Sequence, residues 1–283
     1  MDRNIPLVTI GFDGYDLESA LRGMAKTNSR NVVLCSIDGF TKHVIPEQMD
    51  REAWGKTREL VARNNLNFYG LFGHCNLSDD ADLPKLRKRM EYTQFMGGHY
   101  IDINSGHQGT EKSFYKNLPE VIELAERLDL TVCLETHGDM MQSGKDAARL
   151  FKKIKSPRVR VSYDPANVYF YNQGRAKPAE DLRYALQHIG MIHFKGVNHS
   201  PDKHSWTFPL IRESAKNAVF DYDAVFAVLR ENDYRGMVAV ELEGRFRHEE
   251  GKGFLIDPVW PEAEVVEKYN QEIDYLTRTI TWY

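Results

Sequence analysis

Four short apolar runs in the second half of the chain each end in a side chain that can bind a metal ion. The terminal residues are Glu135, Asp164, His193 and Glu241. Each run looks like a buried strand, and a helix-length segment separates it from the next run. Strands joined in this way are parallel, so their C-terminal ends meet at one face and should bring the four side chains together. Such a site, mostly of oxygen ligands, suits one divalent ion, with Mn²⁺ preferred and Mg²⁺, Co²⁺, Zn²⁺ or Fe²⁺ as alternatives. The runs span residues 131–135, 159–164, 189–193 and 237–241.

The rest of the chain must supply the scaffold for these strands, and it alternates between strand-like and helix-like segments throughout. Eight strands and eight helices without a linker predict one (β/α)₈ TIM barrel over residues 1–283, with the active site at the C-terminal ends of the strands. A doubly wound sheet is the competing architecture, but no strand is followed by a GxGxxG or GxxxxGK(S/T) motif. The other expected strands are 5–11, 31–36, 66–72 and 99–104, and the expected helices are 17–26, 50–64, 83–96, 113–128, 146–154, 179–188, 222–232 and 262–279.

Composition narrows the classes of function. The chain carries 37 Lys and Arg against 41 Asp and Glu, and the net charge of −4 gives no basic footprint for nucleic acid. No apolar run approaches the roughly 18 residues that span a membrane, and residues 1–6 lack the pattern of a signal peptide. Cys35, Cys75 and Cys133 have no CxxC spacing and indicate reduced, buried thiols. We therefore expect a cytoplasmic protein that binds neither nucleic acid nor membrane.

The sequences around the four ligands resemble the signature strands of a known superfamily. The chain is similar to the xylose isomerase-like barrels, which include sugar isomerases, ketose 3-epimerases, inosose dehydratases and AP endonucleases. The resemblance implies the same four metal ligands that the strand pattern predicts. The segments that carry it are Leu134-Glu-Thr-His137, Tyr163-Asp-Pro-Ala-Asn167, Ile192-His-Phe-Lys-Gly196 and Val240-Glu-Leu-Glu243.

The reaction that this resemblance implies begins with removal of a proton next to a sugar carbonyl. A divalent ion would stabilise the negative charge that develops on the carbonyl oxygen. Glu135 and Glu241 could act as base and acid on opposite faces of the substrate while also binding the metal, as the likeness to ketose 3-epimerases implies. We therefore expect a sugar isomerase or epimerase that acts on a ketose. The alternative is a dehydratase or lyase that performs the same first step on an inosose or an oxidised sugar.

Two residues near these strand ends carry charge that the reaction could use. Glu243 faces the same way as Glu241 on a strand, so it is either the true metal ligand or a carboxylate behind it. Glu241 is preferred because it ends the apolar run. Lys195 could stabilise an enolate oxygen or form only a salt bridge. Gly196 replaces the aspartate that usually follows this lysine in the sugar isomerase-like pattern, which predicts a wider pocket mouth and a larger, oxidised or cyclic substrate.

Several other side chains are candidates for substrate contacts, each with a structural alternative. His74 could line the pocket or serve only as a structural hydrogen-bonding residue. His137 could contact a sugar hydroxyl or cap a loop. Asn167 could bind a sugar hydroxyl, but ketose 3-epimerases often carry histidine there, so the particular substrate stays open. An apolar wall against the sugar ring could come from Trp206, Phe208 and Phe12.

The loop at residues 198–204 allows a second metal or a lid. It contains His199, a further candidate for contact with the substrate. Asp202 and His204 have the D-x-H spacing with which related AP endonucleases bind an additional zinc. A zinc phosphodiesterase would also need histidines that strands two and six lack, and the acidic net charge further disfavours DNA as a substrate. The loop could equally be solvated, or a lid over the substrate.

Two further interpretations concern binding rather than catalysis. A barrel that binds a sugar or metal without turnover is disfavoured, because a mere scaffold needs no ligands at four strand ends. Related barrels are often dimers or tetramers, and the apolar residues 280–283 are a weak candidate for such an interface.

Overall fold

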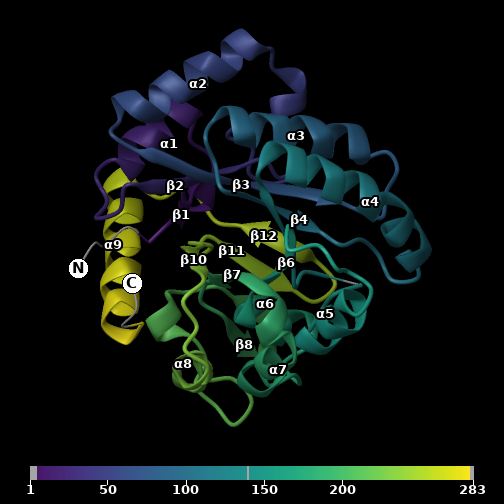
Figure 1. Ribbon diagram of the computed structural model, residues 1–283. Helices are drawn as coiled ribbons and strands as arrows, with labels where there is room; N and C mark the ends of the chain where they lie inside the picture. Colours follow the sequence, from purple (N-terminus) through teal and green to yellow (C-terminus); the bar gives the residue numbers. More distant parts are fainter. Residues whose placement is uncertain (1–4, 139, 281–283) are drawn as a thin grey trace.

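The computed structural model describes residues 5–138 and 140–280 and shows a closed barrel of eight parallel strands with helices around it (Figure 1). Successive barrel strands are neighbours, and the ring closes where Leu7 lies opposite Val240. The predicted single (β/α)₈ architecture is confirmed. Around the barrel the strands are β1 (Leu7–Val8), β10 (Met237–Val240), β7 (Ile189–Phe194), β6 (Val159–Tyr163), β5 (Thr131–Glu135), β4 (Tyr100–Asn104), β3 (Asn67–Asn76) and β2 (Asn31–Cys35).

The helices cover the outside of the barrel with their apolar faces, as the periodicity of the sequence predicts. Polar residues begin several of them: the Asp50 carboxylate accepts a hydrogen bond from the Ala53 amide at 2.8 Å, and the Ser143 hydroxyl accepts one from Asp146 at 3.1 Å. The described helices are α1 (Leu17–Met24), α2 (Arg51–Arg63), α3 (Leu83–Phe95), α4 (Glu111–Leu128), α5 (Gly144–Phe151), α6 (Pro165–Tyr171), α7 (Pro178–Ala185), α8 (Tyr222–Glu231) and α9 (Glu262–Thr279).

The first strand is shorter than predicted. Only Leu7–Val8 pair in the barrel, and a 3₁₀ turn over Thr9–Phe12 replaces the expected continuation to residue 11. Side chains take over the backbone hydrogen bonds here: the Cys35 amide donates to the Thr9 hydroxyl at 3.0 Å, and the Gly11 amide donates to the Tyr269 hydroxyl at 3.0 Å. Tyr269 belongs to α9, which packs beside α1 (Figure 1). The last helix therefore decides how the first strand ends.

Strict alternation of strand and helix is also wrong in two places. First, two helices, α6 and α7, lie between β6 and β7, where one was predicted. The additional helix, α6, starts directly after β6, because the Asp164 carboxylate caps its amides and Pro165 occupies its first turn. In addition, the loops after β7 and β10 form a second, antiparallel sheet of four strands in the order β12-β11-β9-β8. Its strands are β8 (Asn198–Ser200), β9 (Ser205–Thr207), β11 (Phe246–Glu249) and β12 (Gly253–Ile256).

The remaining predictions about the chain as a whole concern its thiols, membranes and the C-terminal residues. Cys35, Cys75 and Cys133 are free and buried, as predicted. Within the described ranges, no helix has both the length and the apolarity that crossing a membrane requires. Of the segment 280–283 considered as an interface, Ile280 is buried and residues 281–283 lie outside the described residues.

Helix α9 carries a buried acid that should make the stability of the fold depend on pH. The Glu272 side chain is 1% exposed, and its Oε1 accepts a hydrogen bond from the Ile211 amide at 2.7 Å. Burial, opposed by this hydrogen bond, raises the pKa of Glu272 from 4.5 to about 8. The folded protein holds the Glu272 proton more tightly than the unfolded chain does. The contribution of protonated Glu272 to the free energy of unfolding is therefore complete below pH 4.5, and it declines by about 1.4 kcal/mol per pH unit until pH 8 is reached.

Replacement of Glu272 with glutamine should remove this pH dependence. We expect similar free energies of unfolding for wild type and Glu272→Gln at pH 4.5, and a variant that is more stable by a few kcal/mol above pH 8, measured by urea unfolding. Glu264→Gln is the control on the same helix, because Glu264 is exposed and should change stability by less than about 0.5 kcal/mol. Parallel pH profiles for wild type and Glu272→Gln would contradict the prediction.

Candidate active site

A cavity of about 260 Å³ opens at the C-terminal ends of the barrel strands. Phe254 of the added sheet and Phe208 stack on each other and form an aromatic wall of this cavity. Phe208 is one of the three aromatic residues predicted to form such a wall. Phe72 of the barrel also lines the cavity, but it packs against His74 and His193. The polar lining residues lie on β3 and β5 or in segments that follow barrel strands, and they are Asp38, His74, Glu135, His137, Asn167, Lys195, Glu241 and Glu243.

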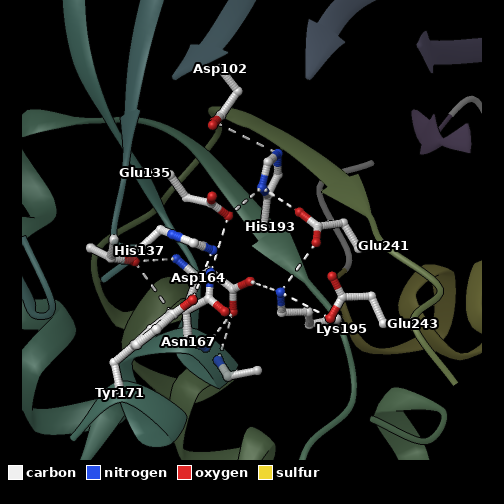
Figure 2. Close-up of polar contacts among 12 residues, drawn as sticks. Asp102, Glu135, His137, Asp164, Asn167, Tyr171, His193, Lys195, Glu241 and Glu243 are labelled. Atoms are coloured by element: carbon white, nitrogen blue, oxygen red, sulfur yellow. Dashed lines mark hydrogen bonds and ion pairs between the residues drawn. The ribbon is translucent and has the colours of Figure 1, made fainter. Parts of the chain in front are cut away.

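Three of the four predicted metal ligands converge on one point. Figure 2 shows the imidazole of His193 between the carboxylates of Glu135 and Glu241. Its Nδ1 lies 3.2 Å from Glu135 Oε1 and 2.7 Å from Glu241 Oε1, and all three side chains are buried. Glu135 and Glu241 reach the cavity, while His193 lies behind its lining.

The fourth predicted ligand, Asp164, faces a lysine. One of its oxygens, Oδ1, accepts hydrogen bonds from the amides of Ala166 and Asn167 at the start of α6. The other lies 3.4 Å from the ammonium of Lys195. The same ammonium is 3.3 Å from Glu241 and 3.2 Å from Glu243. Lys195 thus forms the salt bridges considered as its structural role, and it also lines the cavity.

The carboxyl groups of this cluster differ in how readily they lose their protons. Burial raises the pKa of Asp164 to about 7 and that of Glu243 to about 8, with Lys195 opposing and the neighbouring carboxylates adding to the effect. For Glu135, burial is overcome by hydrogen bonds with His193 and His74, which hold its pKa well below the usual range. Lys195 and His193 likewise outweigh burial and lower the pKa of Glu241. Glu135 and Glu241 are therefore the ionised carboxylates of the cavity.

Neighbouring polar side chains fix the position of Glu135. His74 Nε2 lies 3.1 Å from Glu135 Oε2, and the Asn167 amide donates to Glu135 Oε1 at 3.2 Å. His137 stands beside them, 2.8 Å from the hydroxyl of Tyr171, and burial lowers its pKa to about 4, so its ring is neutral at pH 7. His74 and Asn167 consequently hold a carboxylate in addition to facing the cavity.

A comparison with known protein families shows to which family the chain belongs. The sequence profile of the family described as "Xylose isomerase-like TIM barrel" matches residues 35–257. The chain belongs to this family. The resemblance of its four ligand-bearing segments to xylose isomerase-like barrels is thereby confirmed.

Solved structures agree with membership of the xylose isomerase-like TIM barrel family, although their sequences are distant. The chain is similar to a D-allulose 3-epimerase from Methylomonas sp., with 14% identity, 98% of each chain covered and a TM-score of 0.70. It is also similar to a xylose isomerase domain-containing protein from Salmonella typhimurium, with 17% identity, 98% of each chain covered and a TM-score of 0.72. A probable 3-DHS dehydratase, AsbF, from Bacillus anthracis has 14% identity and a TM-score of 0.66, with 97% of this chain and 98% of that chain covered. No curated protein matches by sequence.

The buried polar atoms of this xylose isomerase-like site fit a divalent cation. Glu135, His193 and Glu241 each offer a ligand atom, and these atoms lie within 4.8 Å of one another. Glu241 Oε1 lies beside His193 and Asp164 Oδ2 beside Lys195, but neither oxygen forms a hydrogen bond of normal geometry with a described residue. Buried oxygens without hydrogen bonds are costly, and burial together with neighbouring carboxylates raises the pKa of Asp164 and of Glu243. The two positive charges of a divalent cation among these oxygens would give the oxygens a partner and would lower the two raised pKa values.

Other predicted site residues lie away from the cavity. His199 and Trp206 stack on each other, with ring centroids 3.9 Å apart, in the added sheet, and neither lines the cavity. Phe12 packs in the core against Tyr269. The structure therefore does not place His199, Trp206 or Phe12 against a substrate in this cavity.

The loop proposed as a second metal site or lid is also separate from the cavity. Asp202 and His204 are exposed, and His204 pairs with Glu250 at 2.9 Å. Neither belongs to a cluster of ligand atoms that could hold a metal among the described residues. The D-x-H spacing by itself does not fix where these two side chains lie, so a second metal or a lid at this loop stays a prediction.

The predicted effect of Gly196 on the pocket mouth is wrong. A Cβ atom at this position would collide with the carbonyl of Pro209, so backbone already occupies the space that the missing side chain leaves. Phe208, the residue before Pro209, lines the cavity, whereas Gly196 does not.

Three site residues were missed at the sequence level. Asp102 lies next to the ligands, Tyr171 contacts His137, and Phe254 completes the aromatic wall. Asp102 had a signal, because an acid in the middle of the apolar run 99–104 is costly to bury unless it is used. Tyr171 and Phe254 lie on elements that the alternating pattern did not predict, so no signal could place them.

Proposed function

We propose that this protein is a divalent-metal-dependent sugar epimerase or isomerase that acts on a ketose. The observation that carries the proposal is the pair of ionised, buried carboxylates, Glu135 and Glu241, which meet beside His193 at the cavity. An epimerase needs a base and an acid on two sides of one carbon, and two carboxylates from different strands can supply them. The D-allulose 3-epimerase among the similar structures supports the same reaction class.

The ion would be held by Glu135, Asp164, His193 and Glu241, with Mn²⁺ preferred for this mostly oxygen set. When bound, it would supply Lewis-acid stabilisation of a negatively charged substrate oxygen. The protein residues do the remaining work. One ionised glutamate removes the proton from the substrate carbon and later releases it to solvent, while the other glutamate first takes up a proton from solvent and then returns it to the carbon on the opposite face. His74 and Asn167 keep Glu135 in place, and the aromatic wall excludes water and contacts the apolar face of the sugar.

A dehydratase is the second candidate, and Glu243 is the observation that favours it. This third carboxyl lines the cavity, and burial raises its pKa to about 8, above those of Glu135 and Glu241, so it is the one of the three that holds a proton most readily. A protonated carboxyl can donate a proton to a leaving hydroxyl group after another residue has removed the α-proton. The similar probable dehydratase AsbF shares the fold.

The test is incubation of the metal-loaded protein with a panel of ketoses and inososes in D₂O. Epimerisation predicts solvent deuterium at the carbon next to the carbonyl together with a new sugar epimer of otherwise unchanged formula. Dehydration predicts loss of water from the substrate. Metal binding without exchange in any substrate would favour a barrel that binds without turnover.

Metal content should depend on Glu135. We expect about one divalent ion per chain in wild type and loss of most of it in Glu135→Ala, measured by elemental analysis of identically purified proteins. The double variant Asp202→Ala/His204→Ala should retain the full amount, because these residues lie away from the cluster. A wild type that binds no metal even after reconstitution would contradict the proposed function.

A further inference from the structure

Asp102 is a buried acid without a partner. It lies on β4, its side chain is fully buried, and neither carboxylate oxygen forms a hydrogen bond with any described residue. A buried carboxylate without a partner is expensive, so such residues generally pair with a charge or serve a site. The residue plays no part in the acid and base roles assigned above.

One group faces Asp102 across a narrow gap. Figure 2 shows its carboxylate directed toward the far end of the His193 imidazole, where Nε2 lies 3.9 Å from Asp102 Oδ2. This Nε2 is also without a hydrogen-bond partner among the described residues. The opposite nitrogen, Nδ1, faces Glu135 and Glu241, and the ring of Phe72 packs edge-on against the imidazole at a centroid distance of 5.1 Å. The ring orientation is thus set by packing, with one nitrogen toward the glutamates and the other toward Asp102.

We propose that Asp102 is a positioning residue that accepts the Nε2–H of His193 and so keeps the Nδ1 lone pair directed at the metal site. The inference rests on the proposed function, because it assumes an ion between His193 and the two glutamates. A neutral imidazole carries its proton on one nitrogen only, and metal-binding histidines generally donate the other ring N–H to a carboxylate or carbonyl. A side-chain movement of about 1 Å shortens the gap to a hydrogen bond. The Ser162 hydroxyl also lies beside Asp102, but a carboxylate has two oxygens and can accept from both donors.

The test compares Asp102→Asn and Asp102→Ala with wild type in two measurements on the full-length protein. The first is Mn²⁺ affinity and stoichiometry after removal and restoration of the metal, measured by competition with a chelator. The second is the urea stability of the metal-free protein. Glu272→Gln, which removes a buried carboxyl on α9 outside the ligand cluster and the cavity lining, is the control and should leave Mn²⁺ affinity unchanged.

The proposal predicts opposite signs for the two measurements. Asp102→Ala should weaken Mn²⁺ binding by about 10- to 100-fold at unchanged stoichiometry. The metal-free variant should be at least as stable as wild type, because a buried carboxyl group whose oxygens lack hydrogen bonds has been removed. Asp102→Asn should bind Mn²⁺ more tightly than Asp102→Ala, since its amide oxygen still accepts the Nε2–H although its charge is gone.

Three results would overturn the proposal. Unchanged affinity in Asp102→Ala would mean that His193 needs no such partner. Equal losses in the Asn and Ala variants would show that only the charge matters. A stoichiometry of two in wild type that falls to one would make Asp102 a direct ligand, since its oxygen lies within 4.8 Å of ligand atoms of His74 and Glu135. A wild type that binds no Mn²⁺ would defeat the proposed function itself, whereas a metal-binding, active wild type with an unaffected Asp102→Ala defeats only this inference.

Discussion

Replacing Glu241 with glutamine should lower the rate of proton exchange at the substrate carbon by about 10²- to 10⁴-fold while the metal remains bound. Glutamine keeps the size of the side chain and an oxygen that can bind a cation, but it can neither take nor give a proton at pH 7. Glu241 is buried, ionised and at the cavity, which are the properties that the role requires. Deuterium incorporation from solvent, measured with metal content on the same samples, checks both halves of the expectation.

Glu243→Gln is the matched comparison for this experiment. Glu243 lines the same cavity and contacts the same lysine, at 3.2 Å, but it stands apart from the cluster of His193 and the two glutamates. Both hypotheses predict that Glu243→Gln retains proton exchange. The dehydratase alternative predicts in addition that the variant no longer removes water from the substrate. Retained exchange in Glu241→Gln would eliminate Glu241 as an acid–base residue.

Replacing Arg89 with methionine should lower the free energy of unfolding by about 3–5 kcal/mol. The guanidinium is fully buried and donates to the carbonyls of Ser36 and Gly73, at 2.7 and 2.6 Å. It also pairs with Glu47 at 2.6 Å and Asp38 at 3.4 Å. Loss of the guanidinium leaves two carbonyls and a carboxylate of low exposure without the hydrogen-bond donor that each of them needs. Urea unfolding measures the effect.

Arg87→Met is the control on the same helix. Arg87 is half exposed and pairs with Glu120 at the surface, so its loss should cost no more than about 1 kcal/mol. Because Asp38 lies at the cavity, Arg89→Met should also loosen the loop after β2 and weaken substrate binding. A stability loss for Arg89→Met as small as that for Arg87→Met would show that the buried network contributes nothing.

The sequence by itself determined the barrel and grouped three of the side chains that could hold a metal ion. Parallel strands present their C-terminal ends at one face, so Glu135, His193 and Glu241 could be grouped from their positions at the ends of apolar runs. The helices followed from the spacing of apolar residues, which depends on local periodicity alone. The choice of Glu241 over Glu243 as a member of the cluster also came from the end of the run, and the structure places Glu241 against His193.

Only the tertiary structure decided what surrounds those ligands. Asp164 faces Lys195, Gly196 admits backbone in place of open space, and Phe254 reaches the cavity from a sheet made of two separate loops. Asp202 and His204 are exposed and do not line the cavity, and β1 ends where the Tyr269 hydroxyl accepts the Gly11 amide. Each of these outcomes depends on contacts between residues distant in the chain. Strand and helix periods fix which way a side chain faces on its own element, but not which other element meets it there.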